Sequence, residues 1–532
     1  MIRKINELKK RTRIFVVLML VMAMMVTAGC SNKNENNNSK SEKSQSDAQS
    51  DESDSDTFSQ GDGSFVSALK MTEEESKLYD EFFSLDSNIK ISIDITDDEL
   101  NKLERDYERN RHNGGKSEIY RMCDMTITVN GTDYEIPEVG IRMKGNTSRT
   151  DFYNSNDGVY NLIHLKVSFN ETFDNTDYYG TDTKVWNDDD AKKEREDRRF
   201  ASLKGLEIKW NREVDGTYTR ETYAYKMYRD FGLLAPNNNL CQCIVNDKNF
   251  GVLKVYEPVD KVFIKRNFDK KDCDGDLYKC TWGNGPADYR EVEGRAGVKD
   301  ESAGKFYTYD LKTNKKKSGH EALTEFIKII NSDDISLDTV EEVLDVDYFV
   351  KFMAVSYFLG MPDDMRNNYN NHYVYFRSGD NKAVFIAYDC DLCLGIEQWN
   401  PTGSYMTQAD PYAKVAYGAQ QRQGNKLIRK SLSRTGFLVD EYTKALDDVM
   451  ASKWLTIDNF KSYYEKIEKN YSAVVVPDIR FRNLNDCQKT MSIDDTYMNG
   501  TTSTRNKNMQ IEEYFERIKD TYKENRIEDD AK

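Results

Sequence analysis

Regular spacing of apolar and polar residues begins near Phe65, where it first has the period of two that strands show. Residues 84–96 alternate and lead into Asp97-Asp98-Glu99-Leu100, an acidic opening typical of a helix. Residues 125–136 predict a hairpin, because an Asn-Gly pair, a favoured two-residue turn, separates two apolar runs. A second hairpin is expected over residues 240–257, around a polar turn.

A helix is expected over residues 220–231. Its aromatic and apolar residues share one face, and Gly232 ends it. Further strands are expected at residues 139–144 and 162–169. The charged run 174–199 has no apolar period and is expected to be an exposed insertion.

After about residue 320 the apolar spacing becomes mainly helical, interrupted by one more hairpin at 372–389. Strands first and helices later predict an α+β fold with two lobes. We place the folded domain at residues 63–525, with an N-lobe of mixed strands at about 85–260 and a mainly helical C-lobe at 261–525.

Composition supports a large folded domain and argues against nucleic acid as a partner. The chain has 532 residues, 38% of them hydrophobic and 12% aromatic, which is enough for a substantial core. Its formal net charge of -16 gives a surface that repels a phosphate backbone.

The N-terminus has the pattern of an exported, lipid-anchored protein. A basic segment precedes the apolar residues Ile14–Val26, and Thr27-Ala28-Gly29-Cys30 follows. We expect residues 1–29 to be a lipoprotein signal peptide and Cys30 to carry the lipid; the alternative is an uncleaved membrane anchor. Residues 30–62 are almost entirely polar and are expected to form a disordered linker to the membrane. The domain would then lie outside the cytoplasm, on the outer face of the cell membrane or at the spore surface.

The remaining cysteines allow three interpretations. An even number in an exported protein permits disulfides, an anaerobic host permits free thiols, and Cys390-Asp-Leu-Cys393 has the spacing of a zinc ligand pair. The residues concerned are Cys123, Cys241, Cys243, Cys273, Cys280, Cys390, Cys393 and Cys487.

Oxygen ligands gather at the open end of the 372–389 hairpin. If this hairpin turns about Asp380, Asn371 and Asp389 lie across from each other. The same end of the hairpin is preceded in the chain by Asp363 and Asp364 and followed by Asp391. Carboxylate and amide oxygens suit Mg²⁺, which binds one or two carboxylates together with substrate phosphates. Protein kinases arrange an Asp and an Asn before a hairpin and a metal-binding Asp after it.

The same residues resemble the CotH kinase family, a group of spore-coat-type atypical protein kinases. Further segments match in order, over roughly residues 85–400 and more faintly to about 520. The matching segments are Arg142-Met-Lys-Gly-Asn-Thr-Ser-Arg149, Leu165–Phe169, Leu203–Asn211, Arg220–Pro236, Gly251–Lys261, Asp276–Lys279, Asn371-His-Tyr-Val-Tyr and Tyr388-Asp-Cys-Asp.

The resemblance implies a two-lobed kinase-like fold and transfer of phosphate from ATP, with Mg²⁺ or Mn²⁺, to Ser or Thr of a Ser-rich surface or coat protein. It implies a metal site at Asn371, Asp389 and Asp391, and Asp364, with Asp363 as the alternative, as the base. Candidate nucleotide contacts are Arg142, Lys144, Ser148, Lys166, Glu221, Tyr256 and Glu257. Glu221 would orient Lys144 or Lys166, and Tyr256-Glu257 would lie beside the adenine.

Two other functions remain open at this point. The chain can be a kinase-like scaffold or binding module without activity, since ATP is scarce outside cells. It can also be a metal-dependent phosphoester hydrolase that uses the same carboxylates with water as nucleophile. Motifs of serine hydrolases and of P-loop proteins are absent from the sequence.

Overall fold

A computed structural model describes most of the chain after residue 66. The described residues are 67–145, 148–300, 303–396, 406–414, 425–475, 480–483, 490–495, 498–499 and 506–528. The predicted signal peptide, its linker and Cys30 lie outside them, as does Cys487. Among the described residues, no helix combines the length and the apolar character needed to cross a membrane.

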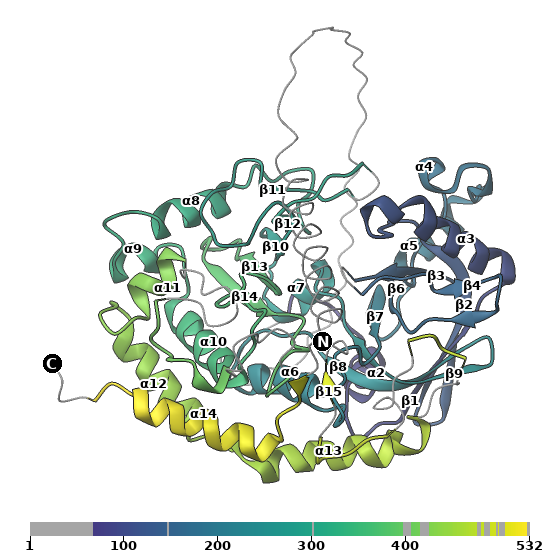
Figure 1. Ribbon diagram of the computed structural model, residues 1–532. Coiled ribbons are helices and arrows are strands. Elements are labelled where there is room, and N and C mark those ends of the chain that lie inside the picture. Colours follow the sequence, from purple (N-terminus) through teal and green to yellow (C-terminus); the bar gives the residue numbers. More distant parts are fainter. Residues whose placement is uncertain are drawn as a thin grey trace, which may run out of the picture. The chain divides into compact units, whose positions relative to one another are not determined.

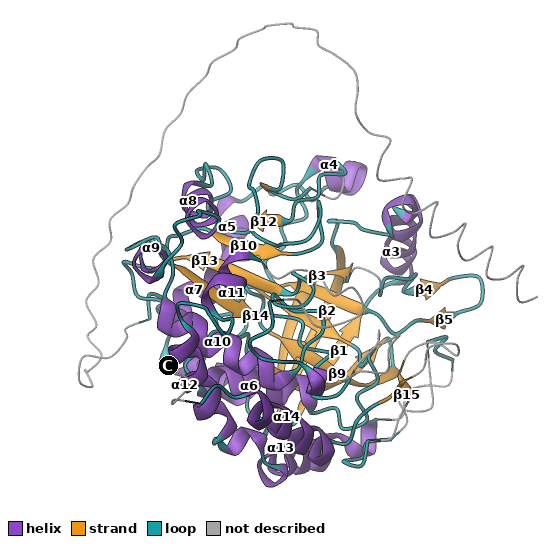
Figure 2. Ribbon diagram, turned by 60° about the vertical axis from the view of Figure 1, so that its left-hand side comes forward, coloured by secondary structure: helices purple, strands orange, loops and turns teal. Residues whose placement is uncertain are grey.

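The segments of the N-terminal half in which apolar and polar residues alternate form a closed β-barrel (Figures 1 and 2). The barrel closes because its first strand pairs in parallel with β8, while the other neighbours are antiparallel. Inward side chains such as Ile89, Ile91 and Ile93 alternate with more exposed ones, as the period of two predicted. The strands, in barrel order, are β1 (Ile89–Asp94), β2 (Arg121–Val129), β3 (Thr132–Lys144), β6 (His164–Ser168), β7 (Gly205–Lys209), β9 (Lys248–Tyr256) and β8 (Asn238–Val245).

A second sheet of five strands contains the predicted third hairpin. Its order is β11 (Ala296–Gly297), β12 (Tyr309–Leu311), β10 (Leu277–Cys280), β13 (His372–Phe376) and β14 (Ala383–Ala387). The hairpin is confirmed, but its register differs slightly from the prediction. His372 opposes Ala387, so continuing the ladder places Asn371 opposite Tyr388, with Asp389 one residue further on. The reason is the turn, which is centred half a residue before Asp380.

Helices make up most of the rest of the described chain. The predicted helix at 220–231 is confirmed as α6 (Arg220–Asp230), which contacts both β8 of the barrel and α10 of the helical part. The 174–199 insertion is mostly exposed, as expected, and contains two short helices. The other helices are α2 (Glu73–Phe82), α3 (Asp97–Arg109), α4 (Thr176–Tyr179), α5 (Asp189–Asp197), α7 (Lys261–Asn267), α8 (Glu321–Ile330), α9 (Leu337–Glu341), α10 (Val346–Leu359), α11 (Lys426–Ser431), α12 (Val439–Met450), α13 (Ile457–Tyr471) and α14 (Ile511–Asn525). Short strand pairs are β4 (Tyr153–Asn154) with β5 (Val159–Tyr160), and β15 (Met498–Asn499) with β16 (Asn506–Lys507).

The two largest apolar cores of the described residues correspond to the two parts of the fold, which is α+β as predicted. One core fills the barrel, and the larger one joins α6, the second sheet and helices α8, α10, α12 and α14. Figure 1 shows α10, α12 and α14 grouped on the side of the second sheet, away from most of the barrel. The buried apolar residues of α6 belong to the larger core, while Glu221 in its first turn pairs with Lys209 and Lys254 of the barrel.

Arg220 at the start of α6 ties three distant segments together. Its side chain is fully buried. It donates to the Met509 carbonyl at 2.9 Å and to the Leu394 carbonyl, and it forms ion pairs with Asp495 at 3.0 Å and Asp215 at 3.3 Å. The guanidinium therefore fixes α6 relative to the segment after β14 and to the C-terminal part of the chain.

Replacing Arg220 by Ala should lower the free energy of unfolding by about 3–5 kcal/mol, because Asp215 and Asp495 would keep buried charges without their partner. Urea unfolding followed by circular dichroism measures the change. Arg517→Ala, which removes an exposed pair with Glu513, is the matched control and should cost less than about 1 kcal/mol. Equal losses in the two variants would contradict this role for Arg220.

Candidate functional site

A large cleft lies between the barrel and the second sheet. Its volume is about 1550 Å³, and its lining comes from β3, β6 and β7 on one side. The other side comes from β10, β12, the start of β13 and the segments 362–371 and 388–392. Cations outnumber carboxylates among its lining side chains, although the whole chain is acidic.

Lys209 of β7 lines the cleft and interacts with two carboxylates. Its ammonium contacts the carboxylate of Asp389 and lies 3.5 Å from that of Glu221 on α6. Glu221 also pairs with Lys254 of β9 at 3.0 Å. Burial opposes charge at these positions, but Asp389 and Glu221 raise the pKa of Lys209 well above its ordinary value.

Tyr225 links the same helix to the segment after β14. Its hydroxyl accepts a hydrogen bond from the backbone N–H of Asp389 at 2.8 Å and donates to Glu221 at 3.4 Å. Although burial works against ionisation, Lys209 and Lys144 hold the pKa of Asp389 below its usual range. Asp389 is therefore an anion held in place through both its backbone and its side chain.

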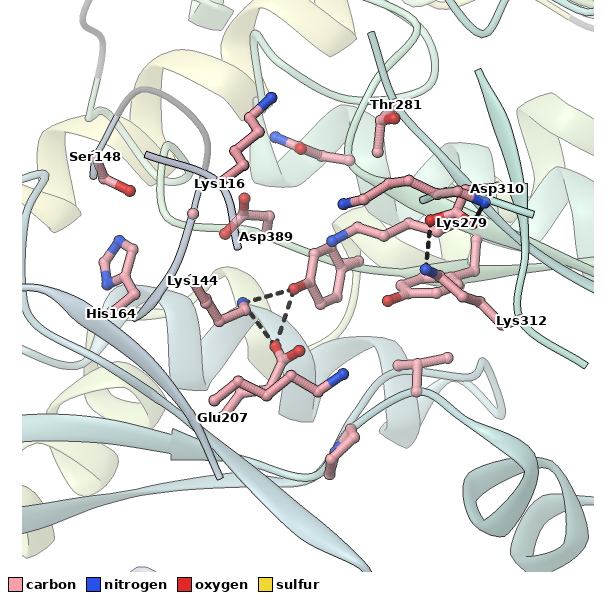
Figure 3. A pocket seen from close by; sticks show the side chains of 18 of the residues that line it. Lys116, Lys144, Ser148, His164, Glu207, Lys279, Thr281, Asp310, Lys312 and Asp389 are labelled. Carbon is pink, nitrogen blue, oxygen red and sulfur yellow. Dashed lines mark hydrogen bonds and ion pairs between the residues drawn. The ribbon is translucent and has the colours of Figure 1, made fainter. Parts of the chain in front are cut away.

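A second network lies beside the first, on the wall formed by β3 and β7 (Figure 3). Lys144 pairs with Glu207 at 2.7 Å and donates to the Tyr388 hydroxyl at 2.8 Å. That hydroxyl donates to Glu207 at 2.9 Å, which closes the triangle. The site thus presents an ordered row of charges along β7, with Glu207 and Lys209 on the same face of the strand.

Asn371 and Asp389 both have left-handed backbone conformations, with φ of 50° and 58°. Asn and Asp tolerate this region better than other residues that carry a side chain. These two residues flank the open end of the β13–β14 ladder, and both line the cleft. Left-handed residues at such places commonly mark functional sites, where the surrounding structure holds the strain.

Asp363 lies in the cleft and accepts hydrogen bonds from three asparagine amides. Asn371 donates at 2.9 Å and Asn370 at 3.1 Å, and Asn368 also donates. Burial raises the pKa of Asp363 to about 6. A carboxylate with a pKa near neutrality, at the cleft surface, is suited to accept a proton.

Asp364 lies in the wall behind the cleft and does not line it. It accepts bonds from the Ser356 hydroxyl and from the backbone N–H groups of Arg366 and Asn367, at 3.0 and 2.8 Å. Its side chain is 4% exposed. These contacts shape the 361–371 segment, so the geometry favours Asp363, the sequence-based alternative, for a role at the cleft surface.

The predicted metal ligands Asn371, Asp389 and Asp391 all line the cleft. Burial and the nearby charge of Asp389 raise the pKa of Asp391 well above its ordinary value. Within the described residues, no three His, Cys, Asp or Glu side chains are close enough to form a metal cage. Carboxylate and amide oxygens are nevertheless the donor types that Mg²⁺ binds together with water and substrate phosphates.

The candidate nucleotide contacts Arg142, Lys144, Ser148 and Lys166 all line the cleft. Arg142 pairs with Glu118 at 2.9 Å. The chain turns after β3 at Gly145, where φ is 115° and a Cβ would lie 2.2 Å from the Ser148 hydroxyl oxygen. Only glycine fits there without a shift, which lets the backbone come close to a ligand.

Glu221, Tyr256 and Glu257 lie outside the cleft lining. Glu221 pairs with Lys209 of β7 and Lys254 of β9 instead of Lys144 or Lys166. Glu257 is buried and pairs with Arg266, behind the wall. The residues that follow it, 258–260, line the cleft in its place.

Sequence reasoning gave Lys209 no role, although Lys209 lies within a segment that matches the CotH pattern. A signal was present: Glu207 and Lys209 alternate with Leu206 and Ile208 in a short strand, so two charges lie on one face of a buried element. The described cysteines, including Cys390 and Cys393, carry free thiols.

Lys279 of β10 is a further cleft residue that the sequence did not single out. Its ammonium lies 4.2 Å from the ring centre of Tyr388 and 5.8 Å from that of Tyr373. Burial, reinforced by the positive charge of Lys144, lowers the pKa of Lys279 to about 7.

Comparison with known proteins supports one family. A family model described as CotH kinase protein matches residues 184–524. A solved structure titled "Crystal structure of A Helicobacter pylori proinflammatory kinase CtkA" matches with 10% identity and a TM-score of 0.23, covering 51% of this chain and 87% of that one. No curated protein matches the chain.

Lys279→Met should stabilise the protein near pH 7 by about 4 kcal/mol, and most of this gain should be lost by pH 10. Between pH 7 and about 10 the unfolded chain binds a proton at Lys279 that the folded chain does not, so wild-type stability rises with pH across this window. Urea unfolding at pH 7, 8.5 and 10 measures the difference. Lys328→Met, at an exposed position on α8, is the control and should show no such trend. A gain independent of pH would contradict the lowered pKa.

Proposed function

Because the chain belongs to the CotH kinase family, we propose that it transfers phosphate from ATP to Ser or Thr hydroxyls of a protein. One observation carries this proposal: Lys209, paired with Glu221 and Asp389, lies in the same cleft as Asp363 and Asn371. Protein kinases use a strand lysine paired with a helix glutamate, a metal-binding Asp after a hairpin, and an Asp and an Asn before it.

On the nucleotide side, Asp389 and Asn371 would hold Mg²⁺, and Lys209 would contact the phosphates. Bound Mg²⁺ would neutralise charge on the phosphates. Lys209 supplies a point charge whose position is fixed by Glu221 from behind. Lys144 and Ser148 add further donors on the β3 side of the cleft.

On the acceptor side, Asp363 would take the proton of the attacking hydroxyl. The Asn370 and Asn371 amides hold its carboxylate in one orientation, and its pKa of about 6 leaves it mainly ionised at neutral pH. Asp364 holds the loop that carries Asp363, through its bonds to backbone N–H groups.

We also propose that the enzyme acts outside the cytoplasm, anchored by lipid on Cys30 to the outer face of the cell membrane. The basic segment, the apolar run and the Thr-Ala-Gly-Cys sequence support this placement. A Ser-rich protein of the cell surface or spore coat is then the expected acceptor.

Lys209→Met should reduce phosphate transfer from labelled ATP at least about 100-fold, while Lys254→Met should reduce it less than about tenfold. Both lysines pair with Glu221, but only Lys209 lines the cleft, so the two variants separate phosphate contact from support of the helix. Initial rates with a Ser-rich protein acceptor measure the effect, and thermal unfolding checks that both variants fold. Equal losses would contradict a phosphate contact at Lys209.

The same assay separates the alternative functions. Release of inorganic phosphate without labelled protein would indicate a hydrolase. For an inactive scaffold, millimolar ATP with Mg²⁺ would leave the unfolding temperature unchanged, whereas a nucleotide that binds only the folded state raises it.

Replacing Cys30 by Ala should abolish incorporation of labelled fatty acid and shift the protein from the membrane fraction to the soluble exported fraction. Fractionation of expressing cells, followed by immunoblotting, measures the shift. Cys123→Ala, at a buried barrel position, is the control and should leave the distribution unchanged. Retention of the Cys30 variant in the membrane would favour an uncleaved anchor.

A further inference from the structure

The cleft contains more cationic surface than the nucleotide site uses. Lys209 is matched by Asp389 and Glu221, and Lys144 by Glu207. Pockets for a single small ligand have volumes of roughly 300–1,000 Å³, whereas this cleft has about 1550 Å³. Room therefore remains for a second ligand on the side of β10 and β12.

That side carries a group of cations, which we call the β10–β12 basic wall. It consists of Lys279, Lys312 and Lys299, with Lys166 and Arg142 facing them from the barrel. Figure 3 shows Lys279, Asp310 and Lys312 on one side of the cavity, with Lys144 and Glu207 on the other.

The nearby carboxylates are already engaged. Asp310 pairs with Lys312, Glu118 with Arg142, and Glu207 with Lys144. Among the described residues, no carboxylate lies within ion-pair distance of Lys166 or Lys279. Burial and mutual repulsion lower the pKa of Lys312, so bound negative charge would stabilise the wall.

The basic wall is joined directly to the segment that carries Asp363. Strand β10 pairs with β13, with Cys280 opposite His372, the residue after Asn371. Beyond β10, the Trp282 indole donates to the Asn368 carbonyl at 2.7 Å, and the Asn368 amide donates to Asp363. Trp282 lines the cleft and is 39% exposed, so an apolar face lies next to the cations on the acceptor side.

We propose that the β10–β12 basic wall and Trp282 form the acceptor-docking subsite, which selects Ser residues flanked by Asp or Glu. This inference rests on the proposed kinase function and names its substrate class. Cations beside the acceptor hydroxyl attract flanking carboxylates and place the hydroxyl within reach of Asp363, while Trp282 packs against the peptide. Acceptors lacking acidic neighbours leave Lys166 and Lys279 without a carboxylate at ion-pair distance and bind less well.

The chain itself supplies a suitable probe sequence. Residues 44–60, Ser-Gln-Ser-Asp-Ala-Gln-Ser-Asp-Glu-Ser-Asp-Ser-Asp-Thr-Phe-Ser-Gln, interleave serines with carboxylates and contain no Lys or Arg. A synthetic peptide of this sequence is compared with one in which Asn and Gln replace Asp and Glu. Binding of each fluorescent peptide to the full chain is measured by anisotropy, and phosphate transfer to each by initial rates.

The wild-type chain should bind the acidic peptide at least about tenfold more tightly than the neutral one, and transfer should show the same preference in kcat/KM. The double variant Lys279→Gln, Lys312→Gln should reduce this preference about tenfold, and Trp282→Ala should weaken both peptides. Lys351→Gln, at an exposed position on α10, is the matched control and should keep the preference.

Equal binding of the two peptides by the wild-type chain would overturn the proposal. So would an unchanged preference in the double variant with a raised KM for ATP, because the wall would then serve the nucleotide. If no peptide is phosphorylated but the acidic one binds through the wall, the docking subsite stands and the kinase proposal fails.

Discussion

The charge on Lys209 is the interaction on which the site depends. A buried ammonium is costly unless carboxylates compensate it, and here Glu221 and Asp389 do so from two different segments. Lys209 belongs to the barrel, Glu221 to α6 and Asp389 to the segment after β14. The charge is compensated only when these three elements are in place. Folding of the two parts therefore also sets the geometry of the site. Arg220, one residue before Glu221, strengthens this link by binding the chain just beyond Asp389.

The side of the cleft opposite Lys209 is formed by residues 362–371 and 388–392, which include residues with left-handed backbone conformations. Asn371 and Asp389 hold left-handed conformations at the open end of the β13–β14 ladder, where amide and carboxylate side chains tolerate them. Asp364 binds backbone N–H groups from within the wall, and this leaves the adjacent Asp363 at the cleft surface. In the proposed function, these two neighbouring carboxylates have separate tasks, one structural and one chemical. Their different surroundings, rather than their identity, make the distinction.

Electrostatics distinguish the cleft from the rest of the molecule. The chain is strongly acidic as a whole, yet cations outnumber carboxylates in the cleft lining. A concave, partly desolvated surface of one sign concentrates ligands of the opposite sign. In the proposed function, nucleotide phosphates occupy the side near Lys209, and the β10–β12 basic wall extends the positive surface toward Asp363. The proposed arrangement would connect the binding of the phosphate donor with the choice of the acceptor.

The sequence by itself determined the α+β class, the three hairpins, helix α6 and the residues that gather around Asn371 and Asp389. These follow from short-range rules, because periodicity, turn residues and spacing act within a few tens of residues. Only the tertiary structure decided which strand lysine pairs with both Glu221 and Asp389. Lys144, Lys166, Lys209 and Lys254 all lie on strands and look alike in sequence, but only the strand pairing of the barrel and the position of α6 bring Lys209 to both Glu221 and Asp389. The choice between Asp363 and Asp364 has the same origin, since burial and long-range packing decide which side chain faces the cleft.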